Sequence, residues 1–166
     1  MTTISHYLSG DHGRCDDLFA ECEMHAARQK WTEAVASCAR FGALLERHFQ
    51  MEEAVLFQAF ELATGNASGP TRVMRLEHEQ MRNMLASMRA ALESRHADNF
   101  FGCADTLNTL MQQHNMKEEN ILYPMADNVL RPRAQEIIQA MTALQAADVA
   151  SGSERAEPQS KHETAA

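Results

Sequence analysis

The sequence predicts an all-α protein, an up-down-up-down four-helix bundle with a short fifth C-terminal helix, and three observations support this fold class. Glycine and proline are scarce, with 7 and 4 among 166 residues, and several of them mark breaks between long segments. Within these segments apolar residues recur at spacings of three and four, which is the period of an amphipathic helix. One polar pattern occurs twice, 66 residues apart, so that it falls in the second and fourth of the expected helices.

Breaks and capping residues set the expected helix boundaries. Thr32 and Asp98 are suitable N-caps for the second and fourth helices. The loop 64–70 ends the second helix, and Pro70 lies in the first turn of the third, where proline is tolerated. A further break at Pro132 precedes the last helix. Five helices are therefore expected, at about residues 10–28, 32–63, 70–94, 98–127 and 132–146.

Each of the four longer helices has one apolar seam, which should face the core. The seam residues are Leu8, His12, Cys15, Phe19, Cys22 and Ala26; Cys38, Phe41, Leu45, His48, Glu52 and Val55; Met74, His78, Met81, Leu85, Met88 and Leu92; and Phe100, Ala104, Leu107, Met111, His114, Glu118, Ile121 and Met125. The seams are apolar apart from four histidines and two glutamates. These six polar residues occupy positions where a packed bundle has Leu or Met.

The six polar seam residues belong to the repeated pattern. Segments 48–57 and 114–123 both read His-x-x-x-Glu-Glu-x-[Val/Ile]-Leu-[Phe/Tyr], and each has an acidic residue followed by His 36 residues upstream of its first His. A His and a Glu four residues apart lie on the same helix face, about one turn from each other. The candidate metal ligands are therefore His12, His48, Glu52, His78, His114 and Glu118, a number that suits a site for two metal ions.

The predicted topology brings these side chains to one end of the bundle. His12 and His78 come early in their helices, whereas His48 and His114 come late in theirs, and antiparallel neighbours place these positions at similar heights. Six buried polar groups without partners would each cost about 1–3 kcal/mol, which together rivals the ~5–15 kcal/mol stability of a whole domain. A bound metal would compensate for this cost, and imidazole with carboxylate suits iron, zinc or manganese.

Other polar residues leave more than one interpretation open. The acidic neighbours of the expected ligands either face solvent or accept a hydrogen bond from a ligand imidazole; they are Asp11, Glu53, Glu77 and Glu119. Tyr7 and Tyr123 either pack at the end of the bundle or reach an open metal position with the hydroxyl group. The remaining histidines are expected at the surface or in the tail; they are His6, His25, His96 and His162.

Composition excludes several classes of function. The net charge is −8 and no Lys/Arg cluster offers a footprint for nucleic acid. No apolar run approaches the ~20 residues of a membrane span, and residues 1–6 lack the pattern of a signal peptide, so a cytoplasmic protein without a membrane partner is expected. The four cysteines form no Cys-x-x-Cys pair and are expected to be small buried apolar residues. One domain is expected at 1–146, followed by a disordered tail at 147–166, whose composition is rich in Ser, Gly, Glu and Gln.

The pattern resembles that of the hemerythrin-like (HHE cation-binding) family, which has His, His-x-x-x-Glu, His and His-x-x-x-Glu or Asp on an up-down four-helix bundle. The resemblance covers about residues 8–127, and segment 118–127 is especially typical of it. It implies a non-haem di-iron centre, with two iron ions and an oxo or hydroxo bridge, in which Glu52 and Glu118 bridge the ions. Imidazoles of one repeat would hold one iron and those of the other repeat its partner; which histidine serves which iron is left open. Ferritin-like bundles are less similar, since they use Glu-x-x-His.

One departure from the family bears on function. Oxygen-carrying hemerythrins have a fifth His four residues after the third-helix ligand, and Arg82 stands at that position here. This leaves a metal position open unless Glu79, a tyrosine or Cys15 fills it. A more open iron should favour irreversible oxidation, or chemistry with peroxide or nitric oxide, over reversible carriage of oxygen.

Two functions from different classes are consistent with the sequence. The first is a protein that binds, senses or buffers oxygen or nitric oxide, with an electron donor as a possible partner. The alternative is a di-iron enzyme that reduces peroxide or nitric oxide, or an iron donor in iron-sulfur cluster repair. No acid–base pair beyond the ligands and no flavin domain is evident, which favours a binding protein over an enzyme. A structural zinc site would not explain two bridging-type carboxylates. Oligomeric state, and iron as opposed to manganese or zinc, stay open.

Overall fold

The computed structural model describes the backbone of residues 2–154 and the side chains of residues 2–144. All regular structure in this range is helical. The elements are α1 (Ile4–Ala27), α2 (Trp31–Met51), the π-helical segment η1 (Glu52–Leu56), α3 (Phe57–Thr64), α4 (Pro70–Glu93), α5 (Ala97–Lys117), the π-helical segment η2 (Glu118–Leu122), α6 (Tyr123–Val129), the 3₁₀ segment η3 (Arg131–Arg133) and α7 (Ala134–Glu154).

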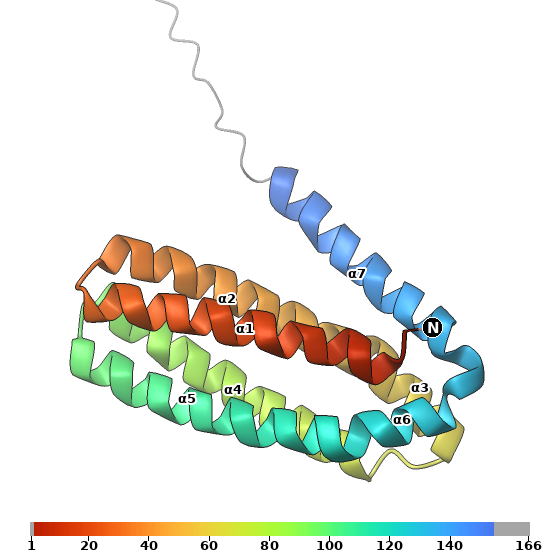
Figure 1. The fold of residues 1–166 in the computed structure, drawn as a ribbon. Coiled ribbons are helices and arrows are strands. Elements are labelled where there is room, and N and C mark those ends of the chain that lie inside the picture. Colours follow the sequence, from red (N-terminus) through yellow and green to blue (C-terminus); the bar gives the residue numbers. More distant parts are fainter. Residues whose placement is uncertain (1, 155–166) are drawn as a thin grey trace, which may run out of the picture.

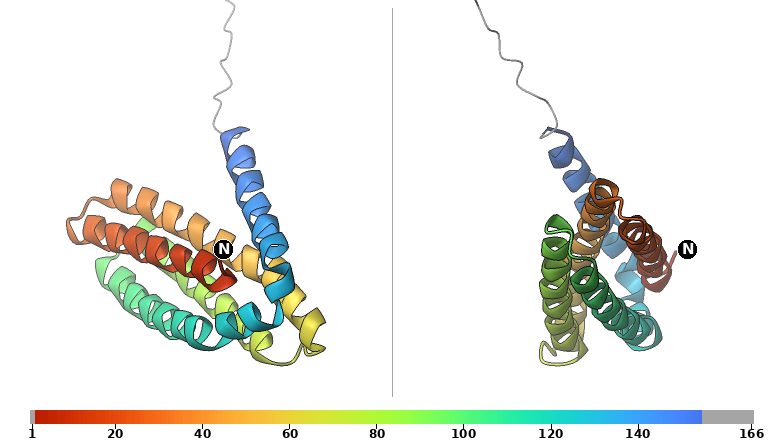
Figure 2. Two further views of the ribbon diagram at one scale, coloured as in Figure 1. Left: turned by 45° about the vertical axis from the view of Figure 1, so that its right-hand side comes forward. Right: turned by 90° about the vertical axis from the view of Figure 1, so that its left-hand side faces the viewer.

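These elements form the predicted four-helix bundle. Helices α1, α2, α4 and α5 lie side by side with alternating directions, and α7 leaves the bundle at the end where the N-terminus lies (Figures 1 and 2). Because η1 and η2 continue the helices without a break, α2, η1 and α3 make one long rod, and α5, η2 and α6 make another. The fold class predicted from the sequence, a bundle with an additional C-terminal helix, is confirmed. None of the helices in the described part of the chain is long and apolar enough to cross a membrane.

The helix starts differ from the prediction in three places. The first helix begins at Ile4 rather than near residue 10, because the Thr3 side chain caps it by accepting a hydrogen bond from the His6 N–H at 3.1 Å. Thr32 is not an N-cap, since α2 already begins at Trp31. Asp98 is not one either: His96 caps α5, and Asp98 lies in the first turn, where a carboxylate favours the positive end of the helix dipole.

The other boundaries agree better with the prediction. Pro70 is the first residue of α4, and Gly65 ends α3 in the left-handed conformation at φ 67°. The last helix was expected to end at residue 146, but α7 continues to Glu154. The rest of the predicted tail, residues 155–166, lies outside the described residues.

The two π-helical segments occur at equivalent places in the repeated pattern and change which residues are buried. Each contains a wider turn, which adds one residue relative to an α-helix and rotates the following residues. The predicted seam positions Ile121 and Met125 are wrong for this reason, since they are 54% and 43% exposed. Leu122 and Tyr123 are buried instead. The same change makes Val55 half-buried while its neighbours Leu56 and Phe57 are fully buried.

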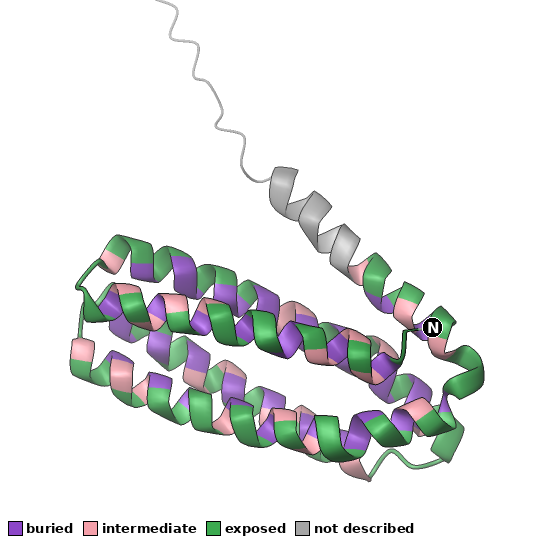
Figure 3. Cartoon of the chain, in the orientation of Figure 1, coloured by how far each residue is buried: buried purple, intermediate pink, exposed green. Residues whose placement is uncertain are grey.

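Buried residues line the inner faces of the helices (Figure 3). The apolar ones among them form two clusters, one toward each end of the bundle. The first cluster lies at the end where α1 joins α2 and includes Phe19, Phe41 and Phe100. The second lies at the end where α7 packs and includes Phe57 and Met141. Between the two clusters the core residues are polar. The bundle therefore encloses a polar layer with apolar packing on both sides.

The shift in helix phase can be tested by mutation. Leu122→Ala is expected to lower the free energy of unfolding by about 2–5 kcal/mol, because it opens a cavity at a fully buried position. Ile121→Ala, its neighbour on the exposed side, is expected to change this free energy by no more than about 0.5 kcal/mol. Urea unfolding of both variants measures the difference. Equal losses, or a larger loss at Ile121, would contradict the π-helical phase.

Candidate metal centre

The polar layer contains all six residues that the repeated pattern singled out. His12 comes from α1, His48 from α2, His78 from α4 and His114 from α5, and the two glutamates are the first residues of η1 and η2. All six are almost completely buried, with exposed fractions of 5% for His12 and 0–2% for the others. They lie at similar heights in the bundle and face one another, as the antiparallel topology requires.

The imidazoles form two pairs, one from each repeat. The Nε2 atoms of His12 and His48 are 3.1 Å apart, and those of His78 and His114 are 3.2 Å apart. The sequence left open which histidines share a metal position, and this geometry pairs those of the same repeat.

The two glutamates lie between these pairs. Glu118 directs Oε1 toward His114 Nε2 at 3.0 Å and Oε2 toward His12 Nε2 at 3.3 Å. Glu52 Oε2 lies 3.2 Å from His78 Nε2 and 3.5 Å from His48 Nε2. Oε2 of Glu52 and Oε1 of Glu118 are buried and have no hydrogen-bond partner among the described residues. Each carboxylate is thus placed between two histidine pairs, with a buried oxygen that needs a cation or a proton.

The spacing of these donor atoms fits metal ions. Neighbouring ligands of an octahedral first-row metal, at bond lengths of about 2.1 Å, are about 3.0 Å apart. The ligand atoms converge into two groups, each within 4.8 Å: Glu52, His78, His114 and Glu118, and His12, His48 and Glu118. Four imidazoles and two carboxylates are donors that suit iron, manganese or zinc. The residues present therefore fit a centre of two cations.

Each imidazole has a carboxylate beside its Nδ1 atom, which donates its N–H to that carboxylate. His12 Nδ1 lies 2.6 Å from Glu119, His78 Nδ1 2.7 Å from Glu53, His114 Nδ1 2.9 Å from Glu77 and His48 Nδ1 3.5 Å from Asp11. Of the two interpretations that the sequence left open, these four acidic residues act as acceptors. Such partners fix the proton on Nδ1 and direct the free Nε2 toward the metal position.

The repeated pattern in the sequence contained these acceptors, but their expected direction in a regular α-helix argued against a role at the site. Glu53 and Glu119 follow Glu52 and Glu118 directly, and in a regular α-helix they would point about 100° away from them. Both lie inside the wider π-helical turns, and both reach an imidazole of another helix. The 66-residue repetition covered all four acceptors, and it was the indication of their shared role.

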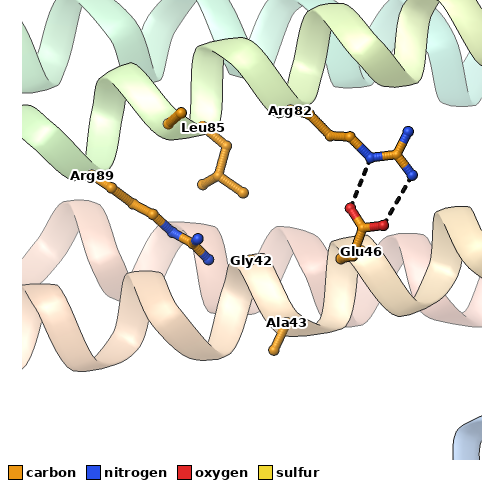
Figure 4. A pocket seen from close by; sticks show the side chains of 7 residues that line it. Gly42, Ala43, Glu46, Arg82, Leu85 and Arg89 are labelled. Atoms are coloured by element: carbon orange, nitrogen blue, oxygen red, sulfur yellow. Dashed lines mark hydrogen bonds and ion pairs between the residues drawn. The ribbon is translucent and has the colours of Figure 1, made fainter. Parts of the chain in front are cut away.

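Arg82, at the position of the absent fifth histidine, supports the centre from outside. Its guanidinium bonds Glu46, with Nε 2.8 Å from Oε2, and also Glu53, with Nη1 3.0 Å from Oε1. Figure 4 shows Arg82 directed toward Glu46, in a surface pocket between α2 and α4 that Arg89 also lines. Burial acts in the opposite direction, but His78 and Arg82 together lower the pKa of Glu53 to about 2. Arg82 thus holds the ionised carboxylate that positions His78.

The two tyrosines have different surroundings. The Tyr7 hydroxyl bonds Thr142 Oγ1 at 3.1 Å, at the end of the bundle. The Tyr123 hydroxyl lies inside the polar layer, where it donates to Glu52 Oε1 at 2.6 Å and lies 3.0 Å from Glu118 Oε2. Burial raises the pKa of Tyr123 well above its usual value, and the two carboxylates raise it further.

The other residues considered from the sequence lie elsewhere. His6 and His96 are exposed, His25 is half-buried beside Glu21, and His162 lies outside the described residues. Glu79 is exposed. Cys15 packs in the first apolar cluster, where burial raises its pKa to about 12 and keeps it a thiol.

Protons compensate the buried carboxylates in the metal-free chain. Burial lowers the pKa of His12 and His78, but Glu118 beside His12 and Glu52 beside His78 outweigh this effect and raise each pKa to about 9. Burial also lowers the pKa of His114, but Glu118 outweighs this effect and raises it. His48 is the exception, since burial lowers its pKa to about 4. His12 and His78 are therefore protonated at neutral pH, and their positive charge compensates part of the negative charge of the two carboxylates.

Metal binding is expected to depend on pH in a defined direction. Coordination needs an unprotonated Nε2, so a metal ion must displace the protons of His12 and His78. The apparent affinity for Co²⁺ should rise with pH from about pH 6 and level off above about pH 9. Calorimetric titration in buffers of different ionisation enthalpy counts the released protons. An affinity that stays constant over this range would contradict the protonation of the two imidazoles.

The acceptor role of Glu119 gives a second prediction. Glu119→Ala should weaken metal binding by roughly 10–100-fold, because it removes the group that orients His12. Glu79→Ala is the matched control: this glutamate is also exposed and also follows a candidate ligand directly, yet it should leave the affinity unchanged. Competition with a metal chelator measures both variants. A loss in the control, or none at Glu119, would show that the carboxylate does not act through His12.

Comparison with known proteins agrees with this geometry. Searches of the curated proteins and of the solved structures found no match. The model of the hemerythrin family, described as the hemerythrin HHE cation binding domain, matches residues 3–126, a range that contains all six candidate ligands. The match covers most of the chain, and it agrees with the family resemblance seen in the sequence. The chain therefore belongs to the hemerythrin family and carries its HHE cation-binding domain.

Proposed function

We propose that this protein is a non-haem di-iron protein that binds, senses or buffers oxygen or nitric oxide. The observation that supports this most directly is the position of two buried carboxylates between two histidine pairs, which is an arrangement for two bridged cations. His12 and His48 would hold one iron and His78 and His114 the other, with Glu52 and Glu118 shared and an oxo or hydroxo bridge between the ions. Iron held there would supply a redox-active centre with affinity for small ligands.

The surroundings of the centre favour a small, uncharged ligand. The six candidate ligands have exposed fractions of 5% or less, which excludes bulky substrates. Phe49 stacks on the His78 ring with 3.9 Å between ring centroids, and Phe57 lies on the same ring at 5.8 Å. A diatomic molecule can enter such an apolar environment without losing strong interactions with water. The Tyr123 hydroxyl supplies a hydrogen-bond donor inside the polar layer.

The number of imidazoles bears on reversibility. Among the described residues four histidines reach the candidate centre. Arg82, which stands at the position of the fifth histidine of the oxygen carriers, bonds Glu46 instead. We expect this more open centre to be oxidised irreversibly by oxygen, and to react with nitric oxide or peroxide. Stopped-flow mixing of the anaerobic reduced protein with oxygen tests this hypothesis. Rapid oxidation would support it, whereas a long-lived, reversible oxygen adduct would contradict it.

An enzymatic function is the alternative, and the Tyr123 hydroxyl is the observation that favours it, because reduction of peroxide or nitric oxide consumes protons. Such an enzyme would take its electrons from an external donor. Steady-state consumption of either substrate with a reductant would support the enzyme, and stoichiometric uptake without turnover would support the binding protein. A donor of iron for cluster repair would instead lose its iron to an acceptor. A cytoplasmic location stays a prediction.

Substitution of a metal ligand should reduce both the metal content and the stability of the protein. His114→Ala is expected to lower the bound metal and to remove the stabilisation that metal binding gives, about 2.7 kcal/mol at a free metal concentration of 100 times Kd. His96→Ala removes a helix cap but should leave the metal content unchanged. Elemental analysis with thermal unfolding, with and without metal, measures both effects. Loss of metal from His96→Ala would contradict the assignment of the ligands.

Elemental analysis and an absorption spectrum of the aerobically purified protein test the proposed function itself. About two irons per chain, with bands of oxo-to-iron charge transfer, would support it. A colourless protein that holds zinc would contradict it.

A further inference from the structure

The 66-residue repetition relates the two halves of the centre, and the halves differ at one informative position. Tyr123 lies against His12 with 5.8 Å between ring centroids and 22° between ring planes. Phe57, its counterpart in the first repeat, lies against His78 at 5.8 Å and 18°. Both rings follow a π-helical segment and both are fully buried. The fold thus provides the same space for a ring twice, and one of the two rings carries a hydroxyl group.

The hydroxyl oxygen lies among the candidate ligand atoms. Tyr123 Oη is 2.6 Å from Glu52 Oε1, 3.0 Å from Glu118 Oε2 and 3.3 Å from His12 Nε2. The last two distances fall within the 3.0–3.5 Å range that separates the histidine and carboxylate atoms from one another. They also match the ~3.0 Å between neighbouring ligands of an octahedral ion. Tyr123 Oη therefore lies at the position of a further ligand atom, on the side of His12 and His48.

We propose that Tyr123 is a metal ligand, whose Oη coordinates the oxidised iron held by His12 and His48. This inference rests on the proposed function. Coordination forms one oxygen–iron bond and releases the hydroxyl proton to solvent, with no change of oxidation state. The two irons then differ: one gains a tyrosine oxygen, and the other, beside Phe57 and Phe49, keeps a position for a small ligand. Tyr123 would be the seventh protein ligand, so the number of ligands would equal that of a centre with a fifth histidine. The absent histidine would belong to the iron held by His78 and His114, whereas Tyr123 binds the other iron.

The experiment uses the iron-loaded, oxidised full chain. Wild type is expected to show a visible phenolate-to-iron charge-transfer band, and excitation in this band should enhance tyrosine ring modes in resonance Raman spectra. Tyr123→Phe should lose both signals and keep about two irons per chain. This substitution copies the residue that the fold already accepts at position 57, so the variant should fold. Tyr7→Phe is the control and should keep both signals, because Tyr7 bonds Thr142 away from the centre.

A second measurement needs no variant. The chain contains two tyrosines, so wild-type protein made with ring-deuterated tyrosine should shift the enhanced modes. Two bound irons without a tyrosine signal, or a signal that persists in Tyr123→Phe, would overturn the ligand assignment and leave the di-iron function standing. A wild-type chain that binds no iron would overturn both, so the two failures are distinguishable.

Discussion

The structure depends on the burial of two carboxylates and four imidazoles between two apolar clusters. An ionised carboxylate removed from water is costly unless a positive charge or hydrogen-bond donors accompany it, and removing one partner of a buried pair costs about 3–5 kcal/mol. Glu52 and Glu118 are completely buried, and each retains an oxygen with no hydrogen-bond partner among the described residues. Protons on His12 and His78 compensate for part of this charge in the metal-free chain. Two cations would do so more completely.

The π-helical segments also supply carboxylates that bond the imidazoles of this polar layer from outside, at Nδ1. A regular helix would present Glu52 or Glu118 to the core and turn the following glutamate toward solvent. With the wider turn, both glutamates of each Glu-Glu pair contact imidazoles. The first glutamate of the pair lies beside Nε2 atoms, and the second bonds an Nδ1 atom. Segments of this type are frequent at functional sites, because the local cost is accepted in exchange for a specific arrangement of side chains. Here the same segment also rotates Phe57 and Tyr123 into the core.

The repetition places equivalent residues in both halves, yet the surroundings of the halves differ. Arg82 and Lys117 pair with the carboxylates that hold His78 and His114. On the other side Arg14 pairs with Asp11, while Glu119 is 43% exposed and bonds His12. The Tyr123 hydroxyl adds to this difference. An approximately symmetric fold thus surrounds the candidate metal centre with an unequal distribution of charge.

The sequence by itself determined the bundle, the family and the six residues of the polar layer. Helical periodicity with scarce glycine and proline defined the long helices, and a His-x-x-x-Glu pattern repeated at 66 residues has few explanations other than a shared site. The sequence did not determine what depends on local departures from ideal helix geometry or on contacts between helices. The phase change after Glu52 and Glu118 moved Ile121 and Met125 to the surface, because a π turn is a backbone feature that apolar spacing does not encode. The pairing of each Nδ1 with a carboxylate of another helix, the outward turn of Arg82 and the entry of the Tyr123 hydroxyl depend on how four helices pack, and tertiary structure alone decided them.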